Sequence, residues 1–302
     1  MNDDLAKGVW LGLSGYILWG LSPIFWKALT DIEALDILSW RILCTFIFAT
    51  SLIKLLGKGK ELHSVASSRT GLLAAMTAGL LIAFNWGMYV WAVDTNHVVD
   101  AALGYFMNPL INVFLGVVIL REKLRPVIWI SVCCAVSGVL WLTFALGSFP
   151  WISVSLACSF ALYGLIRKVA PAGPLTGLTI ETSTVVLPAL LFLIIRGNGI
   201  NNLNISPGIT SLVILSGFMT GIPLLLFASS ARRIPLSILG LLQYITPTLQ
   251  LLLGIFVYGE DFDGVRFIGY SIIWFGLVIF ATDSFFATRI QEVQGNETAE
   301  LS

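Results

Sequence analysis

Two stretches of the chain share one pattern, and together they decide the fold. Residues 98–120 read VVDAALGYFMNPLINVFLGVVIL, and residues 236–258 read LSILGLLQYITPTLQLLLGIFVY. Each is long enough for a helix to cross the hydrocarbon core of a bilayer, which takes about 20 apolar residues. Aligned without a gap, Pro109 of the first stretch meets Pro247 of the second, and Gly116 meets Gly254. The chain therefore carries two copies of at least one membrane-spanning helix.

Apolar segments of this length recur along the whole chain of 302 residues, of which 57% are hydrophobic and 11% charged. A soluble protein keeps about a quarter of its residues charged, so most of this surface must face lipid. Unpaired backbone groups are too costly in lipid, and segments of this length can satisfy them only as helices. The sequence predicts an all-α integral membrane protein with ten transmembrane helices, at residues 8–26, 36–56, 71–93, 98–120, 126–146, 150–166, 176–195, 210–230, 236–258 and 265–286.

The charges of the loops predict the orientation, because Lys and Arg concentrate in the cytoplasmic loops of membrane proteins. With the N-terminus inside, the inner loops hold most of the 17 Lys and Arg residues. The outer side receives Lys27, Arg196 and Arg266, while Arg41 falls within a helix. We expect a multi-pass protein with both termini in the cytoplasm.

The likeness between the two halves extends beyond the quoted stretches, since the same offset places Glu122 on Glu260 and Gly138 on Gly276. Five helices is an odd number, so the second copy enters the membrane from the opposite side. We predict two inverted five-helix repeats, at 8–146 and 150–288, and a short cytoplasmic tail at 289–302 whose Glu and Gln content favours disorder. Inverted repeats are typical of secondary transporters, which hold substrate near the midplane between the repeats. A duplicated fold with a purely structural role is the alternative.

Polar residues line one face of each proline-containing helix, because positions i, i+3 and i+7 of a helix lie together. Each proline also frees a backbone carbonyl. Matched interruptions in two halves point to the substrate site of a transporter. Alternatively, these side chains only hydrogen-bond helices to one another. The candidate binding residues on these two faces are Tyr105, Asn108, Asn112, Gln243, Thr246 and Gln250, with Pro109 and Pro247 as candidate gating residues.

Aromatic residues supply further candidates for a binding site. Aromatic walls with a few placed polar groups suit a small amphipathic molecule. The interfacial belts of membrane proteins are the alternative explanation, which serves Trp10, Trp91 and Trp151 well but the deeper Trp19 poorly. The candidates are Trp19, Asn85, Trp86, Tyr89 and Tyr244.

Three ionisable residues within or at the mouth of predicted helices are candidates for gating or coupling, because such groups are costly in a membrane. We expect Arg41 to meet an outer carboxylate and Glu181 to meet an inner cation, while Asp100 is a candidate proton acceptor. A structural ion pair is the alternative for all three. The expected partners of Arg41 are Asp36, Asp94 or Asp100, and those of Glu181 are Arg121, Arg167, Lys168 or Arg232.

Enzyme chemistry and cofactors find little support in the sequence. His63 and His97 lie in loops, away from any recognisable catalytic pattern. Residues 57–60 read GKGK without the spacing of a nucleotide-binding loop. The four cysteines lie in apolar runs without metal-ligand spacing. We expect no enzyme activity, no cofactor and no metal, and the net charge of zero suggests no nucleic-acid partner. An ion gradient, with protons as the candidate ion, would then supply the energy for transport.

Several motifs together are similar to the RarD-like branch of the EamA family, within the drug/metabolite transporter superfamily. The resemblance spans nearly the whole chain, and its one departure is Asp100 where the family pattern has Glu. The motifs are the segments at 85–91 (NWGMYVW), 97–100 (HVVD), 103–109 (LGYFMNP), 222–227 (IPLLLF), 231–233 (ARR) and 239–250 (LGLLQYITPTLQ).

This resemblance implies a bacterial inner-membrane exporter of small metabolites or drugs, of a type whose name is tied to chloramphenicol sensitivity. We expect alternating access, with residues 98–120 and 236–258 forming the site for a small, neutral or zwitterionic, partly aromatic substrate. The alternative is a membrane-embedded sensor or assembly subunit without transport. Substrate identity, transport direction, coupling ion and oligomeric state stay open, and nothing in the sequence supports a homodimer.

Overall fold

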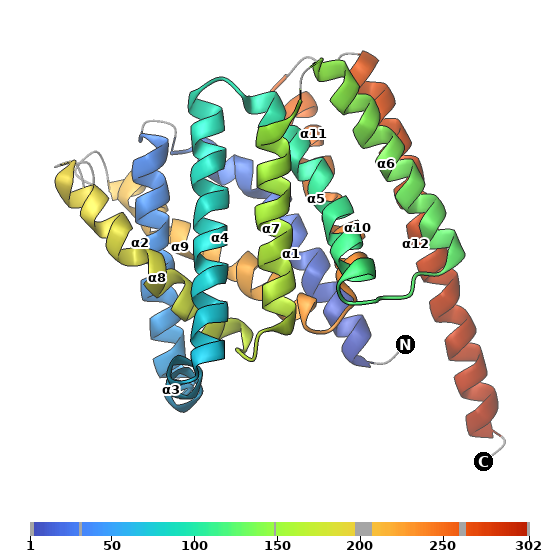
Figure 1. Cartoon of the computed structure of the whole chain (residues 1–302), viewed down its shortest axis with the longest axis horizontal. Helices are drawn as coiled ribbons and strands as arrows, with labels where there is room; N and C mark the ends of the chain where they lie inside the picture. The colour runs from blue at the N-terminus through green and yellow to red at the C-terminus, as the bar shows by residue number, and fades with distance from the viewer. Residues whose placement is uncertain (1–2, 30–31, 148, 197–206, 260–263, 301–302) are drawn as a thin grey trace.

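The computed structural model describes residues 3–29, 32–147, 149–196, 207–259 and 264–300, in the last of these with side chains as far as Asp283 (Figure 1). The described residues form twelve helices. Ten spans are long and apolar enough to cross a membrane, as the sequence predicts, with α10 and α11 sharing one span. The helices are α1 (Asp3–Lys27), α2 (Ala34–Leu55), α3 (Gly59–Ser67), α4 (Arg69–Asp94), α5 (Val98–Val118), α6 (Pro126–Leu146), α7 (Trp151–Val169), α8 (Pro174–Ile195), α9 (Pro207–Ala231), α10 (Leu236–Gln243), α11 (Ile245–Phe256) and α12 (Gly264–Glu300).

The ninth predicted span is broken at Tyr244, between α10 and α11. Pro247 lacks the N–H that would bond to the carbonyl of Gln243, and its ring crowds that carbonyl. At the break, Tyr244 N donates to the carbonyl of Leu241, three residues back, at 3.3 Å. The matching helix α5 instead continues through Pro109. The two proline helices are therefore alike in sequence but differ in shape.

Two further features depart from the predicted boundaries. The short helix α3 lies in a loop where no element is predicted, and only its Val65 is buried. The last helix α12 runs to Glu300, beyond the predicted end at 286 and through most of the tail for which disorder is expected. Glu and Gln, which recur at 291–300, are good helix formers, so the helix can extend past the membrane.

The two repeats pack mainly against each other. Helices α1 and α2 lie on α9, α4 lies between α7 and α8, α5 contacts α7 and α10, and α6 pairs with α12. Close approach depends on small residues: a Cβ at Gly138 would lie 2.7 Å from the carbonyl of Gly269, and one at Gly276 would lie 2.9 Å from that of Ser131. The matched glycines of the two repeats therefore meet at the same α6–α12 contact.

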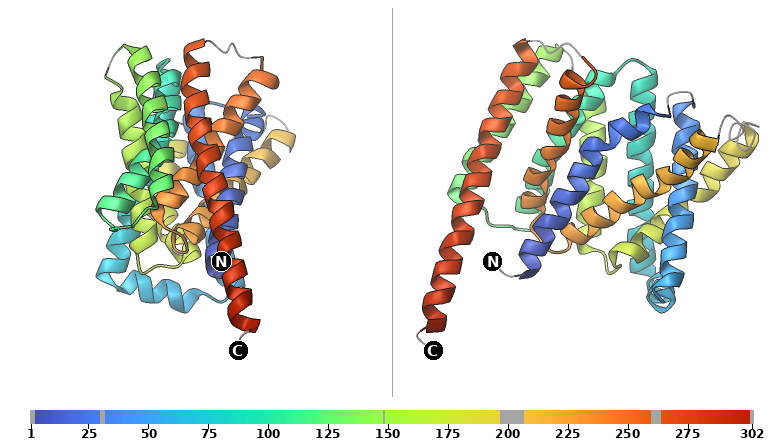
Figure 2. Two further views of the ribbon diagram at one scale, coloured as in Figure 1. Left: turned by 90° about the vertical axis from the view of Figure 1, so that its right-hand side faces the viewer. Right: turned by 180° about the vertical axis from the view of Figure 1, so that it is seen from behind.

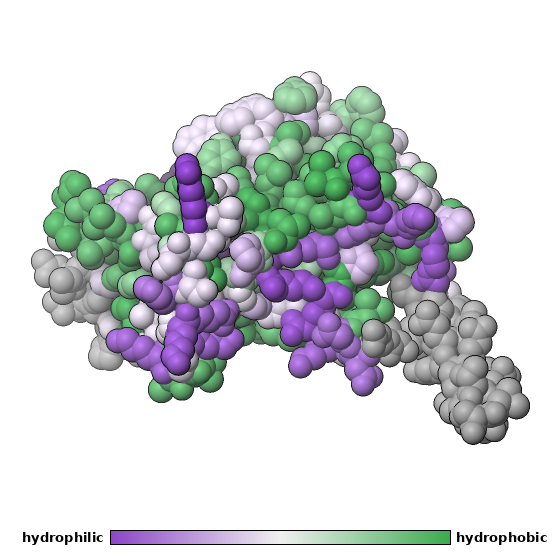
Figure 3. All heavy atoms as spheres, turned by 60° about the horizontal axis from the view of Figure 1, so that its bottom comes forward, coloured by the Kyte–Doolittle hydropathy of each residue, from purple (hydrophilic) through white to green (hydrophobic). Residues whose placement is uncertain are grey.

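Both ends of the described chain lie at the same end of the helix bundle (Figures 1 and 2), which we call the terminal end. Figure 3 looks toward it and shows hydrophilic residues gathered across this face, bordered by hydrophobic side walls. Ion pairs there include Arg125 with Asp283 at 2.5 Å and Arg233 with Asp4 at 3.2 Å. This is the arrangement expected where a bundle leaves the lipid and meets water.

Candidate functional site

A cavity of about 560 Å³ lies between the two repeats, within the usual size range of small-molecule sites. It extends from Lys27, Ala34 and Tyr258, at the end of the bundle opposite the terminal end, down to the middle of the helices. Ten residues that the sequence singles out line it, from both repeats: Trp19, Arg41, Asn85, Trp86, Tyr89, Tyr105, Asn108, Gln243, Thr246 and Gln250.

Several polar side chains of the cavity wall also hydrogen-bond neighbouring helices. Asn85 Nδ2 donates to the Leu156 carbonyl at 2.9 Å and to Ser159 Oγ at 3.0 Å. Asn108 Nδ2 donates to the carbonyl of Ala157 at 2.9 Å. These bonds hold both side chains in fixed orientations within the cavity wall. Structural and binding interpretations of these amides are therefore compatible.

Asn112 does not line the cavity, contrary to the expectation that the whole polar face of its helix does so. It is fully buried just below, where Nδ2 donates to Asn108 Oδ1 at 3.0 Å and to Gln243 Oε1 at 3.1 Å. The reason is geometric, because Asn112 lies one turn closer to the terminal end, where α5 and α10 are in contact. Asn112 therefore joins the two repeats and orients two cavity amides from beneath.

Tyr244 is a second candidate that faces away from the cavity. Its hydroxyl donates to the Phe106 carbonyl at 3.1 Å, and its ring is completely buried against α5 and α12. Gln243 lines the cavity, whereas Tyr244 is turned toward α5 and α12. Tyr244 therefore lies outside the cavity wall, and its role in binding stays a prediction.

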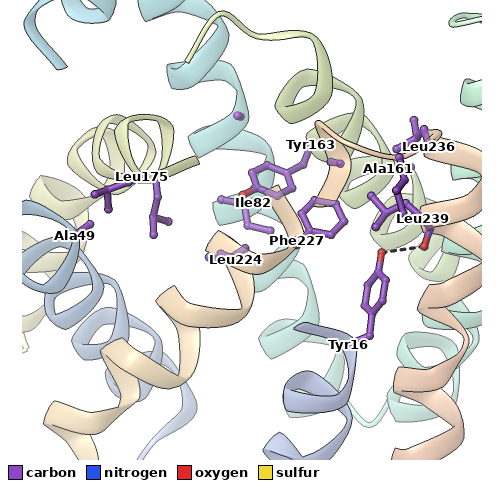
Figure 4. Packing of buried hydrophobic residues seen from close by; sticks show 14 of the residues in the cluster. Tyr16, Ala49, Ile82, Ala161, Tyr163, Leu175, Leu224, Phe227, Leu236 and Leu239 are labelled. Atoms are coloured by element: carbon purple, nitrogen blue, oxygen red, sulfur yellow. Dashed lines mark hydrogen bonds between the residues drawn. The ribbon is translucent and has the colours of Figure 1, made fainter. Parts of the chain in front are cut away.

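Aromatic rings form the wall and floor of the cavity. The ring centroids of Trp19 and Phe160 lie 5.7 Å apart in an edge-to-face contact. Beneath them Tyr163 stacks on Phe227 at 5.9 Å (Figure 4), and Tyr16 closes the same cluster. Edge-to-face and offset contacts of this kind are favourable between aromatic rings. The floor is therefore apolar and tightly packed.

Arg41 lies in the cavity wall without a carboxylate partner among the described residues, which corrects the expectation of an ion pair. Its guanidinium carbon is 4.1 Å from the ring centroid of Trp86 and 5.3 Å from that of Trp26. Asp36 lies about 140° further round the helix, and it instead pairs with Arg196 Nη1 at 3.8 Å. Arg41 therefore faces the cavity, while Asp36 faces α8.

Asp100 and the two prolines also lie outside the cavity wall. The Asp100 carbonyl accepts a hydrogen bond from Ser153 Oγ at 2.6 Å, which joins α5 to α7. Pro109 is buried in α5, and its carbonyl lies close to Gly240. Pro247 lines a second cavity of about 520 Å³, mainly between α5, α6, α11 and α12. It shares five lining residues with the first: Pro23, Tyr89, Tyr105, Gln250 and Tyr258. Gating and coupling roles for these residues stay predictions.

Glu181 forms an ion pair below the aromatic floor, with one of its expected partners. Its Oε1 lies 3.0 Å from Arg167 Nη1, and both side chains are 1% exposed. Tyr163 donates to Glu181 Oε2 at 3.1 Å, and Arg167 Nη2 donates to the Pro174 carbonyl at 2.9 Å. Glu181 Oε1 has no aligned hydrogen bond within the described chain, so the contact with Arg167 is purely an ion pair. A role for Glu181 in coupling stays a prediction.

The bundle is closed at its terminal end by contacts between the repeats. The Glu122 carboxylate accepts hydrogen bonds from the backbone N–H groups of Leu236 and Ser237, at 2.6 and 2.9 Å. Tyr16 Oη donates to the Leu239 carbonyl at 3.1 Å (Figure 4), and Lys168 Nζ lies 4.0 Å from Glu122 Oε1. The cavity thus reaches one end of the bundle and is sealed from the other.

Sequence reasoning missed several residues of the site, among them Phe160, Trp26 and Glu122. A signal existed for Phe160: the likeness of residues 19–21 (WGL) to 163–165 (YGL) also aligns Tyr16 with Phe160, so both repeats send aromatic residues to the floor. No comparable signal marks Trp26, which reads as an interfacial residue. Within the described part of the chain, no cluster of His, Cys, Asp and Glu could hold a metal ion.

Comparison with known proteins gives matches over nearly the whole chain. Residues 6–144 and 150–282 each match the model of the EamA-like transporter family. The chain is 40% identical to an uncharacterized transporter of Pseudomonas aeruginosa, over 95% of this chain and 97% of that protein. It is 35% identical to Protein RarD of Escherichia coli, over 94% of this chain and 96% of that protein. A solved crystal structure shares the fold, with a TM-score of 0.67 and 16% identity over 90% of this chain and 96% of that one.

Proposed function

Because the chain belongs to the EamA-like transporter family, in its RarD-like branch, we propose that it is a secondary-active exporter of small molecules. It resides in a bacterial inner membrane with both termini in the cytoplasm, the orientation that the Lys and Arg of its loops favour. The substrate is a small, amphipathic, partly aromatic molecule that binds between the repeats.

One observation carries this proposal: the cavity between the repeats reaches one end of the bundle and is sealed from the other. Alternating access needs such a state, together with a second state in which the sealed and open ends exchange. In the proposed orientation the open end faces the outside, so this is the state from which an exported substrate leaves.

The contacts at the sealed end are suited to a reversible closure. They consist of a few hydrogen bonds, such as those of Glu122 and Tyr16, over an apolar cluster at the start of α10. A hydrogen bond between neutral groups contributes about 0.5–1.5 kcal/mol, and one to a charged group about 1.5–3 kcal/mol. Binding of substrate or of a coupling ion, with protons as the candidate, is then sufficient to shift the equilibrium between two states.

Counterflow in proteoliposomes tests the function. The protein is reconstituted, loaded with a panel of unlabelled small aromatic compounds, and uptake of each labelled compound is followed with and without a pH gradient. We expect Asn108→Ala and Gln243→Ala to abolish counterflow at unchanged protein abundance. Thr143→Ala is the matched control, since within the described residues Thr143 Oγ1 bonds only to the Val139 carbonyl of its own helix, at 2.8 Å.

Two outcomes would count against the proposal. Normal counterflow in the Asn108→Ala/Gln243→Ala double variant would overturn the location of the site. Saturable binding without any flux of the bound compounds would favour the alternative, a membrane-embedded sensor or assembly subunit.

A further inference from the structure

Arg41 differs from Arg167, Arg196 and Arg232 in what surrounds it. Arg167 faces Glu181 at 3.0 Å, Arg196 faces Glu33 at 2.5 Å, and Arg232 donates to the Ala170 carbonyl at 2.8 Å. Arg41 contacts the faces of two tryptophans and interacts electrostatically with Tyr89 and Tyr105, and its Nε is buried without a hydrogen-bond partner in the described chain. An unpaired cation within a membrane span is costly, and such residues usually act on a substrate or ion.

The two tryptophans hold the guanidinium in a way that keeps its hydrogen-bond donors available. Trp86 of α4 and Trp26 of α1 contact the cation through their ring faces, a favourable contact for Arg. A guanidinium stacks through its plane and donates through its edge. The edge of Arg41 is therefore oriented by aromatic contacts but not saturated by them.

The remainder of the cavity supplies no competing acid. Among the described residues that line it, the charged ones are Lys27 and Arg41, and no Asp or Glu is present. Lys27 lies at the mouth, with Nζ 3.5 Å from the ring centroid of Tyr258, while Arg41 lies deeper, beside Trp86. The electrostatic potential in this cavity therefore favours an anionic ligand group. Arg41 can bind such a group with two parallel hydrogen bonds.

The apolar part of the same cavity can accommodate an aromatic ring of a ligand. Trp19 and Phe160 contribute aromatic rings to its lining, and Asn108 and Gln243 contribute amide groups. A ligand that uses both features carries a flat apolar body and one carboxylate. We propose that Arg41 binds the carboxylate of a small aromatic acid in this cavity. This inference rests on the proposed transport function and names the substrate class for the same site.

Equilibrium binding to the purified full-length protein in detergent tests the inference without any transport. Calorimetric titrations compare acids with their neutral amides: phenylacetate with phenylacetamide, indole-3-acetate with indole-3-acetamide, and phenylalanine with phenylalaninamide. The last pair shows whether the bound acid also carries an amino group. We expect the wild-type protein to bind at least one acid about tenfold more tightly than its amide, as for a bidentate Arg–carboxylate contact.

Three variants locate the effect. Arg41→Gln should reduce the preference for the acid to less than about twofold, and Arg41→Lys should keep only part of it, because an ammonium lacks the two-pronged geometry. Arg196→Gln removes the same charge near the same end of the bundle but outside the cavity, and it should keep the preference. Size-exclusion chromatography and thermal unfolding establish whether each variant is folded. If Arg41→Gln is not folded, Arg41→Lys is used for the comparison of acid with amide.

The inference is overturned if no acid binds to the wild-type protein, if acid and amide bind equally, or if Arg41→Gln retains the wild-type preference. Flux measurements separate this from the function itself. Acid binding that depends on Arg41, without flux, would leave the inference standing and remove the transport proposal. Flux of neutral aromatic compounds that is unchanged in Arg41→Gln would leave the transport proposal standing and remove the inference about Arg41.

Discussion

Replacing Glu181 by Gln removes one charge from an ion pair that is almost fully buried between α7 and α8. At the observed 3.0 Å, the Coulomb attraction in a medium of effective dielectric constant 20 is about 5.5 kcal/mol. Breaking a buried pair by removing one partner typically costs about 3–5 kcal/mol, because the other charge is left uncompensated. The remaining bond from Arg167 to the Pro174 carbonyl limits the penalty, so we expect a loss of about 3 kcal/mol in the free energy of unfolding.

Reversible unfolding by SDS in mixed micelles measures this loss directly. Ser183→Ala is the matched control on the same helix, since Ser183 Oγ bonds only to the Ile180 carbonyl, and it should change stability by less than about 1 kcal/mol. A double variant, Arg167→Met with Glu181→Leu, should recover most of the stability, because an apolar pair of similar volume avoids the desolvation of charge. A loss below about 1 kcal/mol for Glu181→Gln, or a double variant as unstable as the single one, would refute the reasoning.

Three further outcomes are expected. Gly177→Ala should cost about 1–3 kcal/mol in the same unfolding assay, because its Cβ would overlap the guanidinium of the buried ion pair, whereas Gly87→Ala meets no atom within 4 Å and should be tolerated. Glu122→Ala should weaken the seal at the terminal end by about 1–2 kcal/mol and so raise maleimide labelling of Leu239→Cys, in a background without the native cysteines, by about tenfold. Tyr244→Phe should lower stability by about 1 kcal/mol yet leave ligand affinity unchanged, since the lost hydrogen bond lies outside the cavity, and an altered dissociation constant would contradict this.

The membrane-spanning architecture could be predicted from the sequence because hydropathy and helix length are local properties. The requirement to satisfy every backbone group in lipid leaves one form for an apolar segment of some 20 residues. The position of the cavity followed from the matched polar faces around Pro109 and Pro247, since a repeat brings equivalent helices to equivalent places. Asn108, Gln243 and their neighbours therefore meet although they are far apart in the chain.

The partners of individual side chains could not be predicted, because they depend on how each helix is rotated about its own axis. Asp36 and Arg41 lie on the same helix end, yet packing turns one toward α8 and the other toward the cavity. Asn112 is separated from the cavity only by the close contact of α5 with α10. The rotation of each helix depends on the packing of many side chains at once, so no short stretch of sequence predicts it.

The interleaving of the two repeats has a consequence for how the protein is made. The first repeat leaves the ribosome before α7 exists, so Asn85 and Asn108 enter the bilayer without the Leu156 and Ala157 carbonyls to which they donate. Helix α1 likewise lacks Leu239 and Ser230, which bond to Tyr16 and to the Gly8 carbonyl. The first half of the polypeptide therefore enters the membrane with amide groups that still lack their final hydrogen-bond partners. The cavity forms only after the helices of the second repeat have inserted.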